Sequence, residues 1–65
     1  MNPADHMRPR EINRVIRAVN SRETPQEAGL QTESELALYA SIRAEAERWF
    51  DKHGIWPVFE LCELD

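Results

Sequence analysis

A single cysteine, Cys62, in a chain of 65 residues is the feature that most constrains what this sequence can fold into. One thiol cannot close an internal disulfide, and it excludes a zinc site built from four cysteines. A domain of this size hides only about 60% of the surface that its unfolded chain exposes, so its core is small. We therefore expect the missing stability to come from self-association or from a protein partner.

The composition is that of a folded chain without a membrane segment. Charged residues make up 31% and hydrophobic residues 42%, a balance too apolar for a disordered acidic tail. The longest apolar or near-apolar run, 36–40, is far shorter than the ~20 residues that span a bilayer. The N-terminal region lacks an apolar signal segment, and a lone thiol suits a reducing compartment. These features predict a cytoplasmic protein with no membrane association.

Charge and polarity divide the chain unevenly. Residues 1–7 have a polar, turn-prone centre, and we expect them to be a disordered leader before a single small helical domain over 8–65. Residues 1–32 hold five arginines against four acids, whereas 33–65 hold three bases against eight acids. Such a split suits antiparallel or head-to-tail self-pairing, and also a charged docking face for another protein.

Apolar residues at helical spacing predict a first long helix at about 9–21. Pro9 suits the first helical position, where its missing N–H costs nothing. Four branched aliphatic residues recur with the spacing of one helix face: Ile12, Val15, Ile16 and Val19. Three arginines cluster within about 60° on the opposite side: Arg10, Arg14 and Arg17. The helix is therefore expected to have a buried apolar face and an exposed basic face.

A second long helix is predicted at about 33–53. Thr32 and Glu35 form a capping box at its start, and Gly54 is placed to end it. Six residues share one broad face: Leu38, Tyr39, Ile42, Ala46, Trp49 and Phe50. We expect this whole face, including both aromatic rings near its C-terminal end, to form the core with the first helix and the folded-back tail.

A capped turn and an apolar tail complete the predicted all-α fold. The segment 24–27 is a second capping box with proline at the first helical position, and Gly29 can end it in a left-handed conformation. The tail over 55–64 is the most apolar stretch, and Pro57 biases the residue before it toward extended backbone. The apolar spacing fits a short helix over 57–63 and an extended arm equally well. Both conformations therefore stay open.

No residue pattern indicates catalysis or a bound cofactor. His53 and Cys62 could form an activated thiolate or part of a metal site. However, an imidazole in the last turn of the second helix suits the helix dipole, and Cys62 lies among leucines like a small core residue. Glu45 and Glu47 diverge by about 200° on a helix, so they cannot share a proton or a metal. We expect no enzyme activity, no cofactor and no metal site.

The sequence favours a small binding or regulatory protein that acts stoichiometrically on a protein partner, on a second copy of itself as a homodimer, or on both. The first helix offers only four branched aliphatics as cover, so apolar residues of the tail are left over for an interface. By analogy of size, this class includes accessory proteins and inhibitors of phage or mobile-element type. Three apolar anchors and three charged rim residues are expected to bind the partner: Trp56, Phe59, Leu61, Arg10, Arg14 and Arg17.

The alternative is a dimeric nucleic-acid-associated regulator that uses the basic face of the first helix. Arginine forks match phosphate oxygens, and such contacts release counterions. Against this alternative, Glu11 borders the three arginines and the chain has a net charge of -4. The second helix also carries five acids against three bases, unlike a recognition helix.

Overall fold

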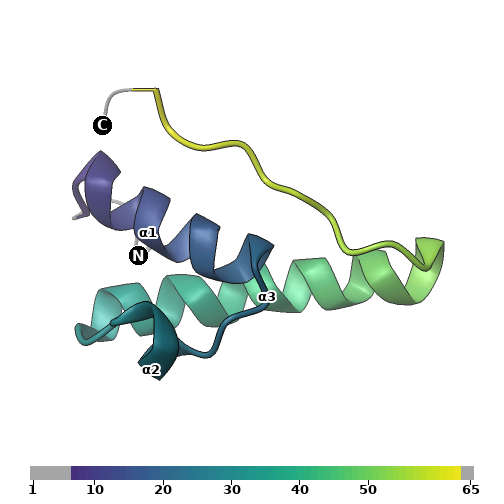
Figure 1. The fold of residues 1–65 in the computed structure, drawn as a ribbon, viewed down its shortest axis with the longest axis horizontal. Coiled ribbons are helices and arrows are strands. Elements are labelled where there is room, and N and C mark those ends of the chain that lie inside the picture. The colour runs from purple at the N-terminus through teal and green to yellow at the C-terminus, as the bar shows by residue number, and fades with distance from the viewer. Residues whose placement is uncertain (1–6, 64–65) are drawn as a thin grey trace.

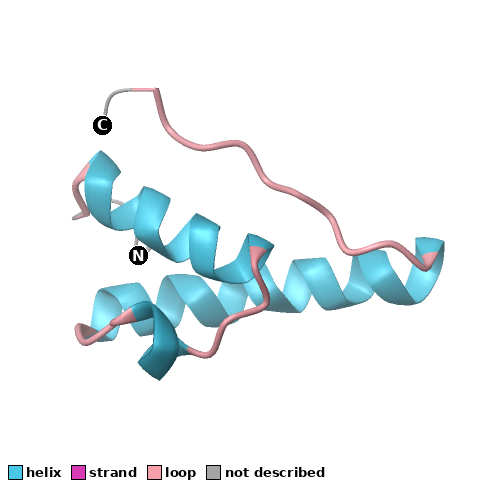
Figure 2. Ribbon diagram, viewed as in Figure 1, coloured by secondary structure: helices cyan, strands magenta, loops and turns pink. Residues whose placement is uncertain are grey.

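The computed structural model describes residues 7–63, and within them the chain forms three helices and a long C-terminal segment (Figures 1 and 2). The helices are α1 (Pro9–Asn20), α2 (Pro25–Ala28) and α3 (Glu33–His53). No strand occurs in the described part of the chain. The predicted all-α fold of two long helices joined by a capped turn is confirmed.

The helices α2 and α3 begin at the two capping boxes that the sequence predicts. The Thr24 hydroxyl accepts a hydrogen bond from the Glu27 N–H (3.2 Å), and the Glu27 carboxylate accepts one from the Thr24 N–H (3.0 Å). Thr32 and Glu35 repeat this exchange at the start of α3 (3.1 and 3.2 Å). Gly29 ends α2 with a φ of 75°, a conformation that glycine adopts without the penalty of a Cβ. Local chemistry therefore sets these boundaries.

The end of α1 is closed by a Schellman motif in which the left-handed residue is not glycine. The Arg22 N–H donates to the Val19 carbonyl (3.1 Å), and the Glu23 N–H donates to the Ala18 carbonyl (2.9 Å). Arg22 has a φ of 58°, and it is the only non-glycine residue between 7 and 63 with a positive φ. A residue with a Cβ in this region costs about 1–2 kcal/mol.

α1 lies between α3 and the C-terminal segment, so it packs on two sides (Figure 1). The core contains seven buried residues: Met7, Val15, Ala18, Val19, Leu30, Tyr39 and Ala46. The Tyr39 hydroxyl donates to the Glu23 carbonyl, which ties α3 to the loop after α1. With 12 residues against 21, α1 is about 18 Å long and α3 about 32 Å. The C-terminal half of α3 therefore projects past α1 (Figure 1).

This difference in length corrects the predicted core. The expectation that Trp49 and Phe50 are core residues is wrong, because α1 ends before it can cover them; they are 50% and 43% exposed. Met7, the last residue of the expected leader, is buried against the core. The rest of the predicted leader, residues 1–6, lies outside the described residues.

Residues 55–63, here called the strap, contain no helix and run back along α1 in an extended path (Figures 1 and 2). Of the two conformations that the sequence leaves open, the structure shows the extended arm. The short helix over 57–63 does not form.

Candidate functional site

Two asparagines of α1 hold the strap by its main chain. The side-chain oxygen of Asn13 accepts a hydrogen bond from the Cys62 N–H (2.6 Å), and its amide nitrogen donates one to the Cys62 carbonyl (3.1 Å). Asn20 binds Phe59 in the same way, accepting from its N–H (2.9 Å) and donating to its carbonyl (3.0 Å). Asn13 is only 1% exposed, so its amide is a buried polar group whose hydrogen bonds are supplied by the strap.

The spacing of the two asparagines matches the spacing of the strap residues that they bind. Asn13 and Asn20 are seven positions apart, a rise of about 10.5 Å that returns to the same helix face within about 20°. Phe59 and Cys62 are three positions apart, which is about 10 Å in an extended chain. The strap therefore runs antiparallel to α1 in a register set by its backbone. Neither asparagine is among the site residues predicted from the sequence, although two residues with low helix propensity at one helix face are a usable signal.

The strap begins against an aromatic and cationic cluster at the end of α1. The Trp56 indole N–H donates to the Val19 carbonyl (2.8 Å). The guanidinium carbon of Arg22 lies 4.3 Å from the Trp56 ring centre and 5.0 Å from that of Phe50, and the two ring centres are 6.2 Å apart. Cation–π contact thus joins the strained Arg22 to both the strap and α3.

The three predicted apolar anchors occupy different environments. Trp56 and Phe59 are half-buried and pack against the core, so much of their apolar area is used inside the molecule. Leu61 is exposed. Most of the other large exposed apolar residues gather in the sequence around the end of α3. We call these four residues the α3 end surface: Trp49, Phe50, Ile55 and Val58.

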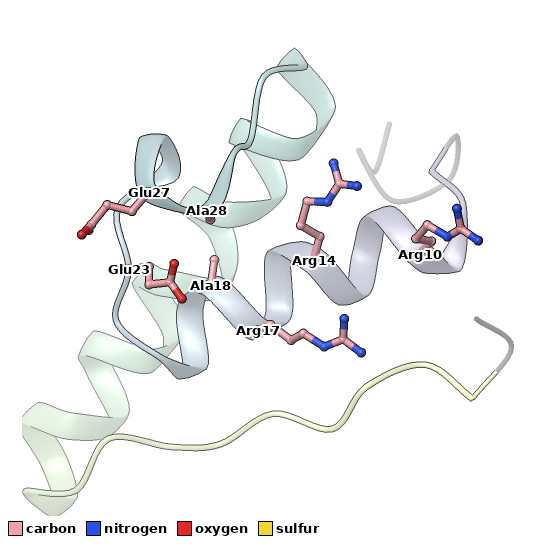
Figure 3. Close-up of a pocket in the computed structure, with 7 residues that line it drawn as sticks. All are labelled: Arg10, Arg14, Arg17, Ala18, Glu23, Glu27 and Ala28. Atoms are coloured by element: carbon pink, nitrogen blue, oxygen red, sulfur yellow. The ribbon is translucent and has the colours of Figure 1, made fainter.

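The three predicted rim arginines lie on one side of α1, beside a hollow of about 470 Å³. Figure 3 shows that the hollow is not purely basic, because Glu23 and Glu27 lie at one end and Arg10 at the other. Arg14 also pairs with the Glu35 carboxylate at 3.5 Å. The geometry therefore brings the arginines to one face, but it balances them with acids.

Glu35 connects the start of α3 to α1. Glu35 is a buried residue, only 3% exposed, and this burial acts to raise the pKa of its carboxyl group. Hydrogen bonds from Thr32 and Gln31, and the positive charge of Arg14, outweigh this effect, so the pKa is lowered below the ordinary glutamate value. The folded structure therefore favours the ionised form of the Glu35 carboxylate.

The residues that the sequence singles out for chemistry lie apart in the described structure. Within 7–63, no three His, Cys, Asp or Glu side chains gather as a metal site, and no helix is long and apolar enough to cross a membrane. The His53 ring lies 4.2 Å from that of Trp49 at the end of α3, whereas Cys62 lies beside the start of α1, so the two do not meet. Comparison of the chain with protein families, curated proteins and solved structures finds no match.

Proposed function

We propose that this protein is a non-catalytic regulatory protein that binds a protein partner stoichiometrically through the α3 end surface. The observation that supports this proposal is the exposure of Trp49, Phe50, Ile55 and Val58 in a chain with so little core. Small domains gain their stability from the apolar area they bury, so large apolar side chains that stay exposed to water are candidates for an interface.

The surroundings of Trp49 suit a protein interface. Arg48 and Lys52 line the same hollow as Trp49, together with Glu45. Tryptophan and arginine are the residue types that contribute most at binding hot spots, and a charged rim around an aromatic centre is typical of such surfaces. Leu61 and the arginine face of α1 would extend the contact along the strap side of the molecule.

The biological setting is part of the same proposal. On the analogy of size and acidity, the role is that of an accessory protein or inhibitor, of phage or mobile-element type, in the cytoplasm. Nucleic acid is the weaker candidate partner, because Glu23 and Glu27 line the hollow beside the arginines and would repel phosphate.

A pair of charge variants tests this function. Trp49→Glu places a carboxylate in the α3 end surface, whereas Ala40→Glu places one on an exposed part of α3 outside it. Each full-length protein, checked for helicity by circular dichroism, is immobilised and exposed to a bacterial lysate. We expect the wild type and Ala40→Glu to bind one protein in a 1:1 ratio, and Trp49→Glu to lose it. If the wild type binds no protein that Trp49→Glu loses, the proposal is wrong.

A further inference from the structure

We propose that the strap is exchangeable between two copies of this chain, so that residues 55–63 of one copy occupy the Asn13 and Asn20 positions of the other. The product is a domain-swapped homodimer. This inference goes beyond the proposed function, since it does not depend on which protein the α3 end surface binds.

The contacts of the strap are of a kind that a second copy can supply unchanged. Asn13 and Asn20 bind the main chain of Cys62 and Phe59, and the Trp56 indole binds a main-chain carbonyl. Because each of these bonds joins the strap to α1, each re-forms when the α1 belongs to another copy. Exchange of an identical element conserves its interactions and changes only the hinge, which is why it is a low-cost route to a dimer.

We assign Gly54 as the hinge, because the turn it forms between α3 and the strap is exposed and is held by one backbone hydrogen bond. It follows α3 with a φ of 74°, and its N–H donates to the Phe50 carbonyl (2.7 Å). Gly54 and Ile55 are both exposed, and a Cβ built on Gly54 meets no atom within 4 Å. Opening the turn therefore meets no steric obstacle at Gly54, and the contacts that the strap loses with its own α1 are the ones that a second α1 supplies. Pro57 keeps the start of the strap extended after release, so the strap loses less conformational entropy when it binds another copy.

The charges of α1 and of the strap are complementary, so they favour α1, of the same copy or of another, as the binding site of the strap. α1 holds Arg10, Arg14 and Arg17 against Glu11, whereas the strap holds Glu60 and Glu63 and no base. Arg17 lies between the two asparagines in the sequence, and Figure 3 shows it on the strap side of α1. Opposite charges steer the encounter of a released strap with another copy and suppress unlike partners.

In the closed monomer, the strap's own α1 competes with the α1 of another copy, because the tether keeps the strap close to it. A strap tethered through a short hinge meets its own α1 at an effective concentration in the millimolar range. We therefore expect the wild type to be a monomer at low micromolar concentration and to dimerise as the concentration approaches millimolar. A change that penalises only the closed hinge should lower the concentration at which the dimer forms.

Two matched glycine variants test the hinge. Gly54→Ala penalises the left-handed turn that closes the strap, and Gly29→Ala places the same strain at a φ of 75°, also with no atom within 4 Å, but away from the hinge. In sedimentation equilibrium, Gly54→Ala should associate at least about tenfold more tightly than the wild type. Gly29→Ala should lower stability without changing association. Equal association of all three proteins overturns the proposal.

A spin label shows directly which copy's α1 the strap binds. We call the hydrogen bonds by which Asn13 and Asn20 hold the strap the clamp. Cys62 is the only cysteine of the chain, it is exposed, and the clamp binds only its main-chain atoms, so a nitroxide can be attached without removing a hydrogen bond. Isotope-labelled Gly54→Ala chains that also carry Cys62→Ser are mixed in urea with spin-labelled, isotope-free Gly54→Ala chains and refolded together. The exchanged dimer broadens the amide signals around Asn13 in the isotope-labelled chains. A dimer without this broadening, or a monomer at millimolar concentration, overturns the proposal.

Discussion

Asn13 and Cys62 are 49 positions apart in the chain, yet one side-chain amide joins them by two hydrogen bonds. The donor and the acceptor of this amide are both used, and both partners are main-chain groups. The path of the strap is therefore determined by side chains of α1. The position of the strap therefore depends on two side-chain amides, those of Asn13 and Asn20. The contribution of each amide can be tested by a separate substitution.

Replacing the clamp amide by a carboxylate should destabilise the protein in a way that depends on pH. Asn13→Asp keeps the acceptor for the Cys62 N–H but turns a donor toward the Cys62 carbonyl into a repelling oxygen. We expect a loss of about 1–3 kcal/mol at pH 7. The loss should shrink as the pH falls and the new carboxyl becomes protonated, because its O–H can again donate. Urea unfolding at several pH values measures both effects.

An exposed amide provides the control for that substitution. Gln26→Glu makes the same chemical change on α2, where the side chain is exposed. Its effect should stay within about 0.5 kcal/mol at each pH. Equal losses for Asn13→Asp and Gln26→Glu would show that the clamp does not contribute to stability.

The two tryptophans should differ in what they contribute. Trp56→Phe removes the indole donor to the Val19 carbonyl and should cost about 1 kcal/mol. Trp49→Phe alters a half-exposed side chain that makes no hydrogen bond in the described structure, and it should cost less than about 0.5 kcal/mol. Thermal unfolding followed by circular dichroism compares the two variants, and a larger cost for Trp49→Phe would contradict the placement of Trp56.

The strained turn after α1 predicts an unusual order of stability. Arg22→Ala keeps the Cβ at a φ of 58° and loses the contacts with Trp56 and Phe50, so it should cost about 0.5–1 kcal/mol. Arg22→Gly loses the same contacts but also relieves the backbone strain. It should therefore be more stable than Arg22→Ala by about 1 kcal/mol. Equal unfolding free energies of the two variants would mean that the turn is not strained.

The lowered pKa of Glu35 predicts a specific acid sensitivity. Because its pKa is lower in the folded than in the unfolded protein, the ionised carboxylate stabilises the fold above the ordinary value of 4.5, and this contribution is lost as the pH falls through the folded value. Glu35→Gln should be less stable than the wild type at pH 7 by about 1 kcal/mol, and the gap should narrow on acidification. Denaturation at pH 7 and at low pH, with exposed Glu45→Gln as the control, measures this gap.

The helices were predictable because their signals are local. A capping box such as Thr32 with Glu35 needs only neighbouring residues, and the glycine that ends α3 needs only its own freedom at positive φ. The spacing of apolar residues also identified the correct face of α3. The position of each long helix followed from these signals alone.

The strap and the uncovered end of α3 could not be predicted in the same way. The conformation of the strap depends on Asn13 and Asn20, which are distant in the sequence and whose amides leave no trace in apolar periodicity. The exposure of Trp49 and Phe50 depends on how far along α3 the shorter α1 reaches. Both are properties of the assembled fold. Which apolar residues stay exposed therefore depends on how the helices and the strap pack, and not on the sequence pattern alone.

Amide hydrogen exchange along the strap tests the clamp most directly. The N–H groups of Phe59 and Cys62 donate to the two asparagines, whereas the N–H groups of Glu60 and Leu61 donate no hydrogen bond to any residue between 7 and 63. In two-dimensional NMR, we predict slow exchange at Phe59 and Cys62 and fast exchange at the two residues between them, with the protection at Cys62 lost in Asn13→Asp. Uniformly fast exchange through the strap would contradict the clamp.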